Sequence, residues 1–288
     1  AIAIDVDDQM DEKELLNRVE YVTRFNHARI GQELTLQAVA VKNVSQNPDS
    51  FAECVKKVAQ NTDKALILCS FLPESLEAAL KFCSDAPLLY AATKGTWEKI
   101  ADLAVQYSCP VAAFADNDLS ELKSLAAALQ SKGIENIALD PGTHPENISC
   151  TLNSFVQIRR ASMDGDEILN CPIIGVPAAV SDPMGEVMAA SMMIDRFADL
   201  IIFHTIDMFA VLPVITLRQN IYTDPRRPVS VDAGLRTFGN PTKDSPLLAT
   251  TNFALTYYTV ASDIESAALN CYLLVFNTEG SGVEASVA

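Results

Sequence analysis

The chain has 288 residues, of which 49% are hydrophobic and 20% are charged, and this composition excludes disordered and fibrous proteins in favour of a globular protein with a substantial core. The 37 acidic residues outnumber the 21 basic ones, so the net charge is -16 and the isoelectric point is about 4.5. Because this much negative charge repels polyanions, we expect neither nucleic acid nor an anionic membrane as a partner.

The apolar runs and the cysteines point to a cytoplasmic protein in a reducing compartment. The longest apolar runs are interrupted by Asp199, His204 and Asp207, so they fall short of the roughly 20 apolar residues that a membrane helix needs. The N-terminal stretch AIAIDVDDQ has neither the basic nor the apolar region of a secretory leader. Seven cysteines are scattered through apolar segments without any CxxC spacing, which predicts small core residues rather than disulfides, zinc ligands or cluster ligands.

The chain first predicts a long helix and then a regular alternation of strands and helices. Residues 11–27 have helical periodicity and would form an extra helix ahead of the first strand, at the bottom of a barrel. Amphipathic helices are expected between successive apolar runs, and Gly133 is placed to end one of them. The eight apolar runs occupy residues 38–42, 65–69, 88–92, 111–115, 136–140, 173–177, 200–204 and 229–233.

Strands that are apolar on both faces and alternate with helices are typical of a buried parallel sheet. Eight such units favour an α/β fold of the closed (β/α)8 type, the TIM barrel, over an open doubly wound sheet. The open sheet is the main alternative, and the absence of a GxGxxG motif after any of the runs disfavours it. We therefore expect residues 1–238 to form a TIM-barrel domain.

A second domain is expected at residues 239–288, after a linker rich in Gly, Pro, Asn and Ser. Residues 250–266 can form a helix, residues 271–280 read as a strand ending in a turn, and the last residues would open another helix. Such a set of elements cannot bury its own apolar faces. We interpret it as the truncated N-terminal part of a Rossmann-like α/β domain.

The carboxyl ends of the predicted strands are where a barrel carries its chemistry. No known catalytic motif occurs there, so no catalytic residue and no metal ligand is assigned. A lysine at such a position can form a Schiff base when it is desolvated, but exposed rim lysines are commoner, and His204 fits a rim histidine better than a ligand. The residues at the strand ends are Lys42, Asn43, Ser70, Thr93, Lys94, Asp116, Asn117, Asp140, Pro177, His204, Thr205 and Asp232.

The stretch ALDPGTHP places Asp140 at the mouth of the expected barrel. Pro141 and Gly142 predict a tight turn, after which Thr143 is placed to cap the next segment. A carboxylate at the mouth can hydrogen-bond a heterocycle such as a pterin, whereas Asp-Pro-Gly also forms turns for purely structural reasons. Both interpretations stay open.

Hydroxyl and amide side chains gather in the second domain. Backbone amides and hydroxyls at helix starts, with glycines that allow close approach, can hold amides, phosphates or a nucleotide-like tail. Simple helix capping and a glycine turn explain the same residues equally well. The helix start carries Thr250, Thr251, Asn252, Thr256 and Thr259, and the strand is followed by Gly280, Ser281 and Gly282.

Several long motifs resemble one known family. They are RIGQELTLQAVAVKNVS, LLYAATKGTWEKIADLA, IALDPGT, LPVITLRQNIYTDPRRPVSVDAGL and PLLATTNFALTYYTVASDIESAALNCYLLVFNTEG. Together they are similar to the large (gamma) subunit of the corrinoid iron-sulfur protein, which belongs to the acetyl-CoA decarbonylase/synthase, or reductive acetyl-CoA, pathway. The resemblance covers essentially the whole chain.

The resemblance implies a methyl carrier with a cobalamin (corrinoid) cofactor. Cobalt in the Co(I) state would take a methyl group from methyltetrahydrofolate or methyltetrahydrosarcinapterin and deliver it to acetyl-CoA synthase. A four-iron four-sulfur cluster would belong to an N-terminal domain absent from this chain. The implied partners are the small corrinoid iron-sulfur protein subunit, a methyltetrahydrofolate methyltransferase and acetyl-CoA synthase/CO dehydrogenase.

The same resemblance assigns cobalamin-binding residues in the second domain. The threonine motif carries over to Thr250 and Thr256, and the glycine turn carries over to Gly280, Ser281, Gly282 and Val283. The family has an aspartate where this chain has Asn277, so that position departs from the pattern. Two other readings remain: a pterin-binding TIM-barrel methyltransferase with Asp140 and Asn117 as ring contacts, and a pure assembly subunit.

Overall fold

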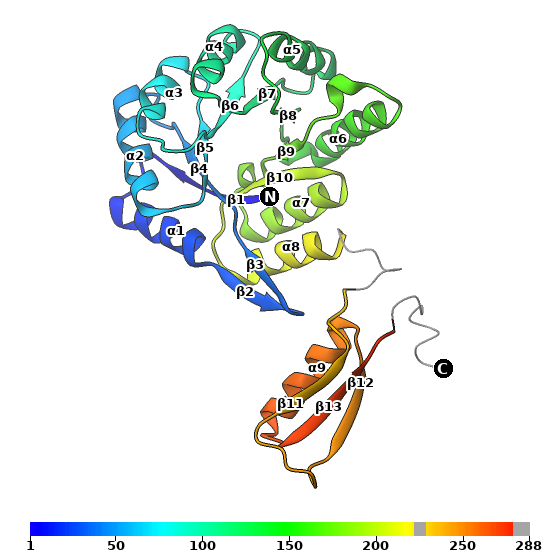
Figure 1. Ribbon diagram of the computed structural model, residues 1–288. Helices are drawn as coiled ribbons and strands as arrows, with labels where there is room; N and C mark the ends of the chain where they lie inside the picture. Colours follow the sequence, from blue (N-terminus) through cyan, green and yellow to red (C-terminus); the bar gives the residue numbers. More distant parts are fainter. Residues whose placement is uncertain (222–228, 279–288) are drawn as a thin grey trace. The chain divides into compact units, whose positions relative to one another are not determined.

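The computed structural model describes residues 1–221 and 229–278, and these residues divide into two compact units (Figure 1). The first unit comprises residues 1–26 and 35–218, and the second comprises residues 27–34 together with the chain from residue 219. Gly280, Ser281, Gly282 and Val283 lie outside the described residues, as does the helix predicted after them.

The first unit is a closed barrel of parallel strands with helices around its outside, as predicted (Figure 1). The strand order around the barrel is β1-β10-β9-β8-β7-β6-β5-β4. Its strands are β1 (Ile2–Asp7), β4 (Ala38–Lys42), β5 (Ala65–Cys69), β6 (Leu88–Ala92), β7 (Val111–Phe114), β8 (Ile137–Asp140), β9 (Ile173–Gly175) and β10 (Ala198–Phe203). A two-stranded hairpin, β2 (Asn26–Arg29) and β3 (Gln32–Thr35), precedes β4.

Seven of the eight predicted strands are confirmed, and the eighth is wrong. Residues 229–233 contribute only an isolated bridge between Ser230 and Phe253, while the place in the barrel is taken by β1 at the N-terminus. Consequently α1 (Glu12–Arg24) is the ordinary helix between β1 and β4 rather than an extra helix at the barrel bottom. The run IAIDV was overlooked as a strand because Asp5 and Asp7 interrupt its apolar character.

The helices begin at local signals that the sequence carries. Pro48, Pro73 and Pro183 occupy first-turn positions, where a missing N–H is harmless, and the Asp118 side chain caps its helix by accepting a bond from the Glu121 amide at 2.9 Å. The α-helices of the barrel after α1 are α2 (Pro48–Asn61), α3 (Pro73–Leu80), α4 (Trp97–Tyr107), α5 (Leu119–Ser131), α6 (Ile148–Met163), α7 (Pro183–Asp195) and α8 (Met208–Ile221). Short 3-10 helices occur at η1 (Pro145–Asn147), η2 (Glu167–Leu169) and η3 (Pro177–Ala179).

Small side chains fill much of the barrel interior. Five strands contribute alanines to this interior cluster at positions where TIM barrels commonly hold bulky branched residues. Side chains on one face of a strand repeat every second residue, so the residues two positions further along these strands also point inward at the mouth. The alanines are Ala3, Ala38, Ala40, Ala91, Ala112 and Ala138. Asp5, Lys42, Phe114 and Asp140 are the mouth residues two positions after Ala3, Ala40, Ala112 and Ala138.

The second unit is built on a three-stranded sheet of order β11-β13-β12, formed by β11 (Gly234–Phe238), β12 (Leu247–Thr251) and β13 (Cys271–Phe276). Strands β12 and β13 are parallel and are joined by α9 (Ala254–Ser266), whereas β11 runs antiparallel to β13. Part of the predicted linker is therefore the strand β11, which lies in the second unit although the predicted boundary fell after residue 238. Residues 250 and 251 end a strand and do not start the helix.

Candidate functional site

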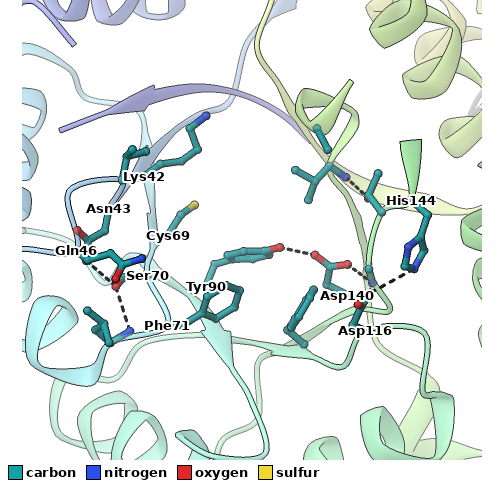
Figure 2. A pocket seen from close by; sticks show the side chains of 17 residues that line it. Lys42, Asn43, Gln46, Cys69, Ser70, Phe71, Tyr90, Asp116, Asp140 and His144 are labelled. Carbon is teal, nitrogen blue, oxygen red and sulfur yellow. Dashed lines mark hydrogen bonds and ion pairs between the residues drawn. The ribbon is translucent and has the colours of Figure 1, made fainter. Parts of the chain in front are cut away.

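A cavity of about 640 Å³ opens at the mouth of the barrel, where the strands end (Figure 2). Strand register brings together Lys42, Cys69 and Tyr90 on β4, β5 and β6, and Phe114 and Asp140 on β7 and β8. Loop residues complete the lining. They include Asn43, Val44, Gln46, Ser70, Phe71, Leu72, Asp116, Gly142, Thr143 and His144, together with Val176 and Ala179.

Asp140 is the central polar group of the cavity. It is 1% exposed, and its carboxylate accepts hydrogen bonds from the Tyr90 hydroxyl at 2.6 Å and from the Gly142 amide at 2.8 Å. Burial raises the pKa of Asp140 to about 6, although the bonds from Tyr90 and Gly142 oppose that rise. Burial, with the charge of Asp140, likewise raises the pKa of Tyr90 well above its ordinary value. Asp140 is therefore a carboxylate that can gain or lose a proton near neutral pH.

The turn after Asp140 needs the glycine that the sequence provides. Gly142 has φ of +89°, and a Cβ there would lie 2.6 Å from an oxygen of Asp116. The predicted role of Thr143 as a cap is wrong, because its hydroxyl accepts a bond from the Val176 amide at 3.1 Å and so ties the turn to the end of β9. His144 Nε2 lies 3.2 Å from a carboxylate oxygen of Asp116 at the cavity edge.

A second buried carboxylate, Asp5, belongs to a tightly connected polar cluster. Its oxygens lie 2.6 Å from the Lys42 amine, 2.5 Å from His204 Nδ1 and 3.5 Å from the Arg18 guanidinium. Burial acts to raise the pKa of Asp5, but the His204 hydrogen bond and the nearby Lys42 charge outweigh it and lower the pKa. Glu186 on α7 supports the same cluster by accepting bonds from the Thr205 amide at 3.0 Å and the Thr205 hydroxyl at 2.5 Å.

The candidates predicted at the strand ends separate into three groups. Lys42, Asn43, Ser70, Asp116 and Asp140 line the cavity. His204 and Thr205 join the Asp5 cluster.

The remaining candidates lie apart from the cavity. Asn117 is exposed and its side-chain oxygen accepts bonds from Cys150 and Ser154, so it does not meet the proposed ring position. Lys94 is 80% exposed and pairs with Glu121. Asp232 lies within the wrongly predicted strand 229–233 and belongs to the second unit.

Sequence reasoning missed three groups near the mouth: Asp5, Tyr90 and His144. Tyr90 and Asp5 point inward within strands, so only the alternation of faces along each strand would have found them. His144 arrives from a loop.

The cysteines and the acidic residues form no metal site in the part of the chain that is described. Cys54, Cys109 and Cys271 are buried and the other four are partly buried, all with free thiols. Among residues 1–221 and 229–278, no group of three or more His, Cys, Asp or Glu side chains is arranged to hold a metal ion. No helix in these ranges is long and apolar enough to cross a membrane.

The second unit has polar groups at the carboxyl edge of its parallel strands. The hydroxyls of Thr250 and Thr251 at the end of β12 are buried and lack hydrogen-bond partners among residues 1–221 and 229–278. Asn252, 5% exposed, accepts bonds from the Thr278 amide at 2.9 Å and the Thr278 hydroxyl at 2.5 Å, which ties the end of β12 to the end of β13. Thr256 is exposed in the first turn of α9, whose N-cap residue makes no side-chain cap bond.

The fold and the mouth cavity define a (β/α)8-barrel protein with a ligand-sized site that is mostly apolar and carries several polar groups, accompanied by a small α/β unit. The family model described as "CO dehydrogenase/acetyl-CoA synthase delta subunit" matches residues 1–288, and the chain belongs to this family. Its relatives include the protein named acetyl-CoA decarbonylase/synthase complex subunit gamma from Methanosarcina acetivorans, 45% identical over 99% of this chain. The same-named protein from Methanothermobacter thermautotrophicus is 41% identical over 100% of this chain. The predicted resemblance to the gamma subunit is thereby confirmed.

The chain spans 63% and 65% of the length of these two relatives. Among solved structures, dihydropteroate synthase from Thermus thermophilus matches with a TM-score of 0.54 and 19% identity, covering 77% of this chain and 94% of that one. The Xanthomonas albilineans dihydropteroate synthase solved with 7,8-dihydropteroate matches with a TM-score of 0.54 and 14% identity, covering 78% and 93%. At such identities the likeness concerns the barrel fold alone.

Proposed function

We propose that this chain is the corrinoid-carrying part of a methyl-transfer subunit of an acetyl-CoA decarbonylase/synthase. Its family and its gamma-subunit relatives support the proposal. The observation that carries it is the pair of buried, unpartnered hydroxyls on Thr250 and Thr251 at the carboxyl edge of β12. Ligands of open parallel sheets bind outside that edge.

The residues at this edge fit a large neutral macrocycle that is fringed with amides. A buried hydroxyl without a partner is unfavourable, and an amide of such a ligand would satisfy it. The uncapped start of α9 offers further backbone donors. A charged side chain at this edge would have to be desolvated against a neutral ligand, and β12 and the first turn of α9 carry none.

Thr250 and Thr256 would hold the corrinoid, together with Gly280, Ser281, Gly282 and Val283 by family resemblance. Asn252 would act as a positioning residue, because its bonds to Thr278 direct the chain that leads into the glycine turn. When bound, the corrinoid supplies a nucleophilic Co(I) centre for a methyl group from methyltetrahydrofolate or methyltetrahydrosarcinapterin. The chain itself then needs no acid or base at this site.

The proposed partners follow from this role. They are the small corrinoid iron-sulfur protein subunit, a methyltetrahydrofolate methyltransferase, and acetyl-CoA synthase/CO dehydrogenase as the methyl acceptor. A four-iron four-sulfur cluster would be carried outside this chain.

The test is cobalt content, measured with an anaerobic absorption spectrum on the full-length protein purified with its small subunit and supplied with corrinoid. Thr250→Val should lower bound cobalt severalfold while the fold is kept. Thr259→Val is the matched control, since that hydroxyl only bonds the Leu255 carbonyl within α9. An intact wild-type protein without cobalt would overturn the proposal.

A second candidate, a pterin-binding barrel methyltransferase, is favoured by the mouth cavity and the position of Asp140 in it. Asn117 drops out as a ring contact because it is exposed and engaged elsewhere. This candidate requires that Asp140→Ala abolish methyl transfer catalysed by the chain. Full activity of that variant would eliminate it.

A further inference from the structure

Two charged side chains face each other across the barrel mouth. Strands β4 and β8 are separated by three strands on either side of the closed barrel, so their ends lie diametrically opposite. Lys42 ends β4, Asp140 ends β8, and both line the cavity. Figure 2 shows the Lys42 amine and the Asp140 carboxylate on opposite sides of the open space, with the Tyr90 ring between them.

The Lys42 amine is held in place by Asp5 and keeps N–H donors for a further partner. Asp5 is fully buried and fixes the Lys42 amine at 2.6 Å, while the Lys42 side chain stays 36% exposed. An ammonium group has three N–H donors, and the bond to Asp5 uses one. Among the described residues that line the cavity, Lys42 is the only lysine or arginine. It is therefore a positioned cation that can receive an anionic or carbonyl oxygen.

The Asp140 side has spare acceptor capacity. One carboxylate oxygen takes the Tyr90 hydroxyl and the other takes the Gly142 amide. Each carboxylate oxygen can accept more than one bond, so two parallel N–H donors from a ligand can still be accommodated. In the described residues no lysine or arginine forms an ion pair with Asp140. The turn alone does not need this charge, because an asparagine oxygen would accept the Gly142 bond equally well.

An aromatic wall connects the two sides. Phe71 lies 5.4 Å from Phe114 and 6.4 Å from Tyr90 between ring centroids, and Cys69 continues the wall toward Lys42. Such a surface favours the face of a flat ring. The cavity volume of about 640 Å³ lies within the range of small-molecule sites.

We propose that the barrel mouth binds a flat nitrogen heterocycle, with an N–H donor edge on Asp140 and an anionic group on Lys42. A pterin carrying a carboxylate and a guanine nucleotide share this chemistry. The site is independent of the corrinoid proposal, because it uses only the first unit. It requires no catalysis, so it also differs from the barrel methyltransferase.

The experiment is isothermal titration calorimetry on the full chain at pH 8 without corrinoid. The pterin probes are pterin-6-carboxylate and neutral 6-methylpterin, and the purine probes are guanosine monophosphate and neutral guanosine. Each pair keeps the donor edge and differs in the anion. Binding of the pterin probes would identify a pterin as the ligand, and binding of the purine probes would identify a guanine nucleotide.

The variants separate the two contacts. Asp140→Asn should weaken the binding of both probes of the pair that binds by about tenfold or more, since hydrogen bonds to a charged carboxylate are stronger than those to a neutral amide. Lys42→Met should weaken only the anionic member, by about tenfold. Asp102→Asn and Lys94→Met are matched controls on exposed groups outside the cavity and should change neither. Circular dichroism confirms folding of each variant.

Two results would overturn the proposal: no binding of any probe at millimolar concentration, or binding that Asp140→Asn leaves unchanged. If Lys42→Met fails to fold, the salt dependence of wild-type binding replaces it. The anionic probe should then lose affinity with added salt while the neutral probe does not. Equal salt dependence of the two probes would contradict the proposed contact between the anionic group and Lys42. Variants that abolish heterocycle binding should leave the cobalt content unchanged. A failure of this proposal can therefore be told apart from a failure of the proposed carrier function.

Discussion

Asp5 and Asp140 are both buried carboxylates at the mouth of the same barrel, yet their surroundings differ in kind. Asp5 is enclosed by Lys42, His204 and Arg18, and the hydrogen bond to His204 and the charge of Lys42 lower its pKa in spite of burial. Within the described part of the chain, Asp140 receives hydrogen bonds only from a tyrosine hydroxyl and a backbone amide, and burial raises its pKa to about 6. The charge of Asp5 is neutralised by neighbouring side chains and stabilises the barrel, whereas the charge of Asp140 has no ion-pair partner among the described residues and faces the cavity.

The comparison predicts opposite effects of pH on stability. A folded pKa below the ordinary 3.8 means that Asp5 contributes stability at neutral pH, which is lost as the pH falls through its folded pKa. A folded pKa above 3.8 means that Asp140 destabilises the fold once it is ionised. As the pH falls from about 6 to about 4, protonation of Asp140 therefore favours folding.

The largest expected effect is on Asp5. Asp5→Asn leaves Lys42 and Arg18 without their shared carboxylate, so it should reduce the free energy of unfolding at pH 7 by about 3–5 kcal/mol. Urea denaturation measures this loss. A loss of less than about 1 kcal/mol would mean that the cluster is not structural and would remove the contrast with Asp140.

Asp140→Asn should increase the free energy of unfolding, whereas Asp5→Asn should reduce it. The rise in pKa from 3.8 to about 6 corresponds to about 3 kcal/mol, so the variant should be more stable than wild type at pH 8 by on the order of 2–3 kcal/mol. The gain should shrink as the pH falls through 6, because wild-type Asp140 then becomes neutral. Denaturation of both proteins at pH 8 and pH 4.5 gives the answer, and Asp102→Asn serves as the exposed control. A pH-independent difference would contradict the assignment of the charge.

Tyr90→Phe tests the link between the aromatic wall and Asp140. It removes a donor that favours the ionised carboxylate, so the pKa of Asp140 should rise further, and stability at pH 8 should fall by about 1.5 kcal/mol. A carbon-13 NMR titration of the carboxyl group follows the pKa directly. Tyr107→Phe on α4 is the control, and an unchanged Asp140 titration in Tyr90→Phe would exclude the hydrogen bond.

The smallest effect is expected in the second unit, where the same contrast recurs between Asn252 and Thr250. Asn252→Ala removes two accepted bonds and should reduce stability by about 1–2 kcal/mol. Thr250→Val removes a hydroxyl without a partner, so the change should stay within about 0.5 kcal/mol. Thermal denaturation of both variants compares them directly. Equal losses would show that Thr250 has a structural partner.

Sequence patterns predicted the barrel well because seven of its strands are apolar on both faces. They failed at β1, where Asp5 points into the interior and breaks the apolar run, and the β-like run at 229–233 was taken in its place. The site was predicted in part for a similar reason. Strand ends are visible in a sequence, and Asp140 and Lys42 were found there.

Groups that depend on strand register or on loop folding were not visible in the same way. Tyr90 reaches Asp140 from a strand two positions away in the barrel, and a turn brings His144 to the cavity. Thr250 and Thr251 end the strand β12, whereas the sequence pattern predicted them at a helix start, because this short strand carries too few apolar residues to be distinguished from its loop.

The alanines inside the barrel make the depth of the mouth adjustable. Ala40 and Ala138 lie two residues before Lys42 and Asp140, so the smallest side chains of the interior lie just beneath the two charged groups. Exchanging either alanine for valine would make the cavity shallower beneath the neighbouring charged group and would leave both charged groups in place. Such an exchange would change the size of the ligand that this cavity admits without changing the two charged groups that face it.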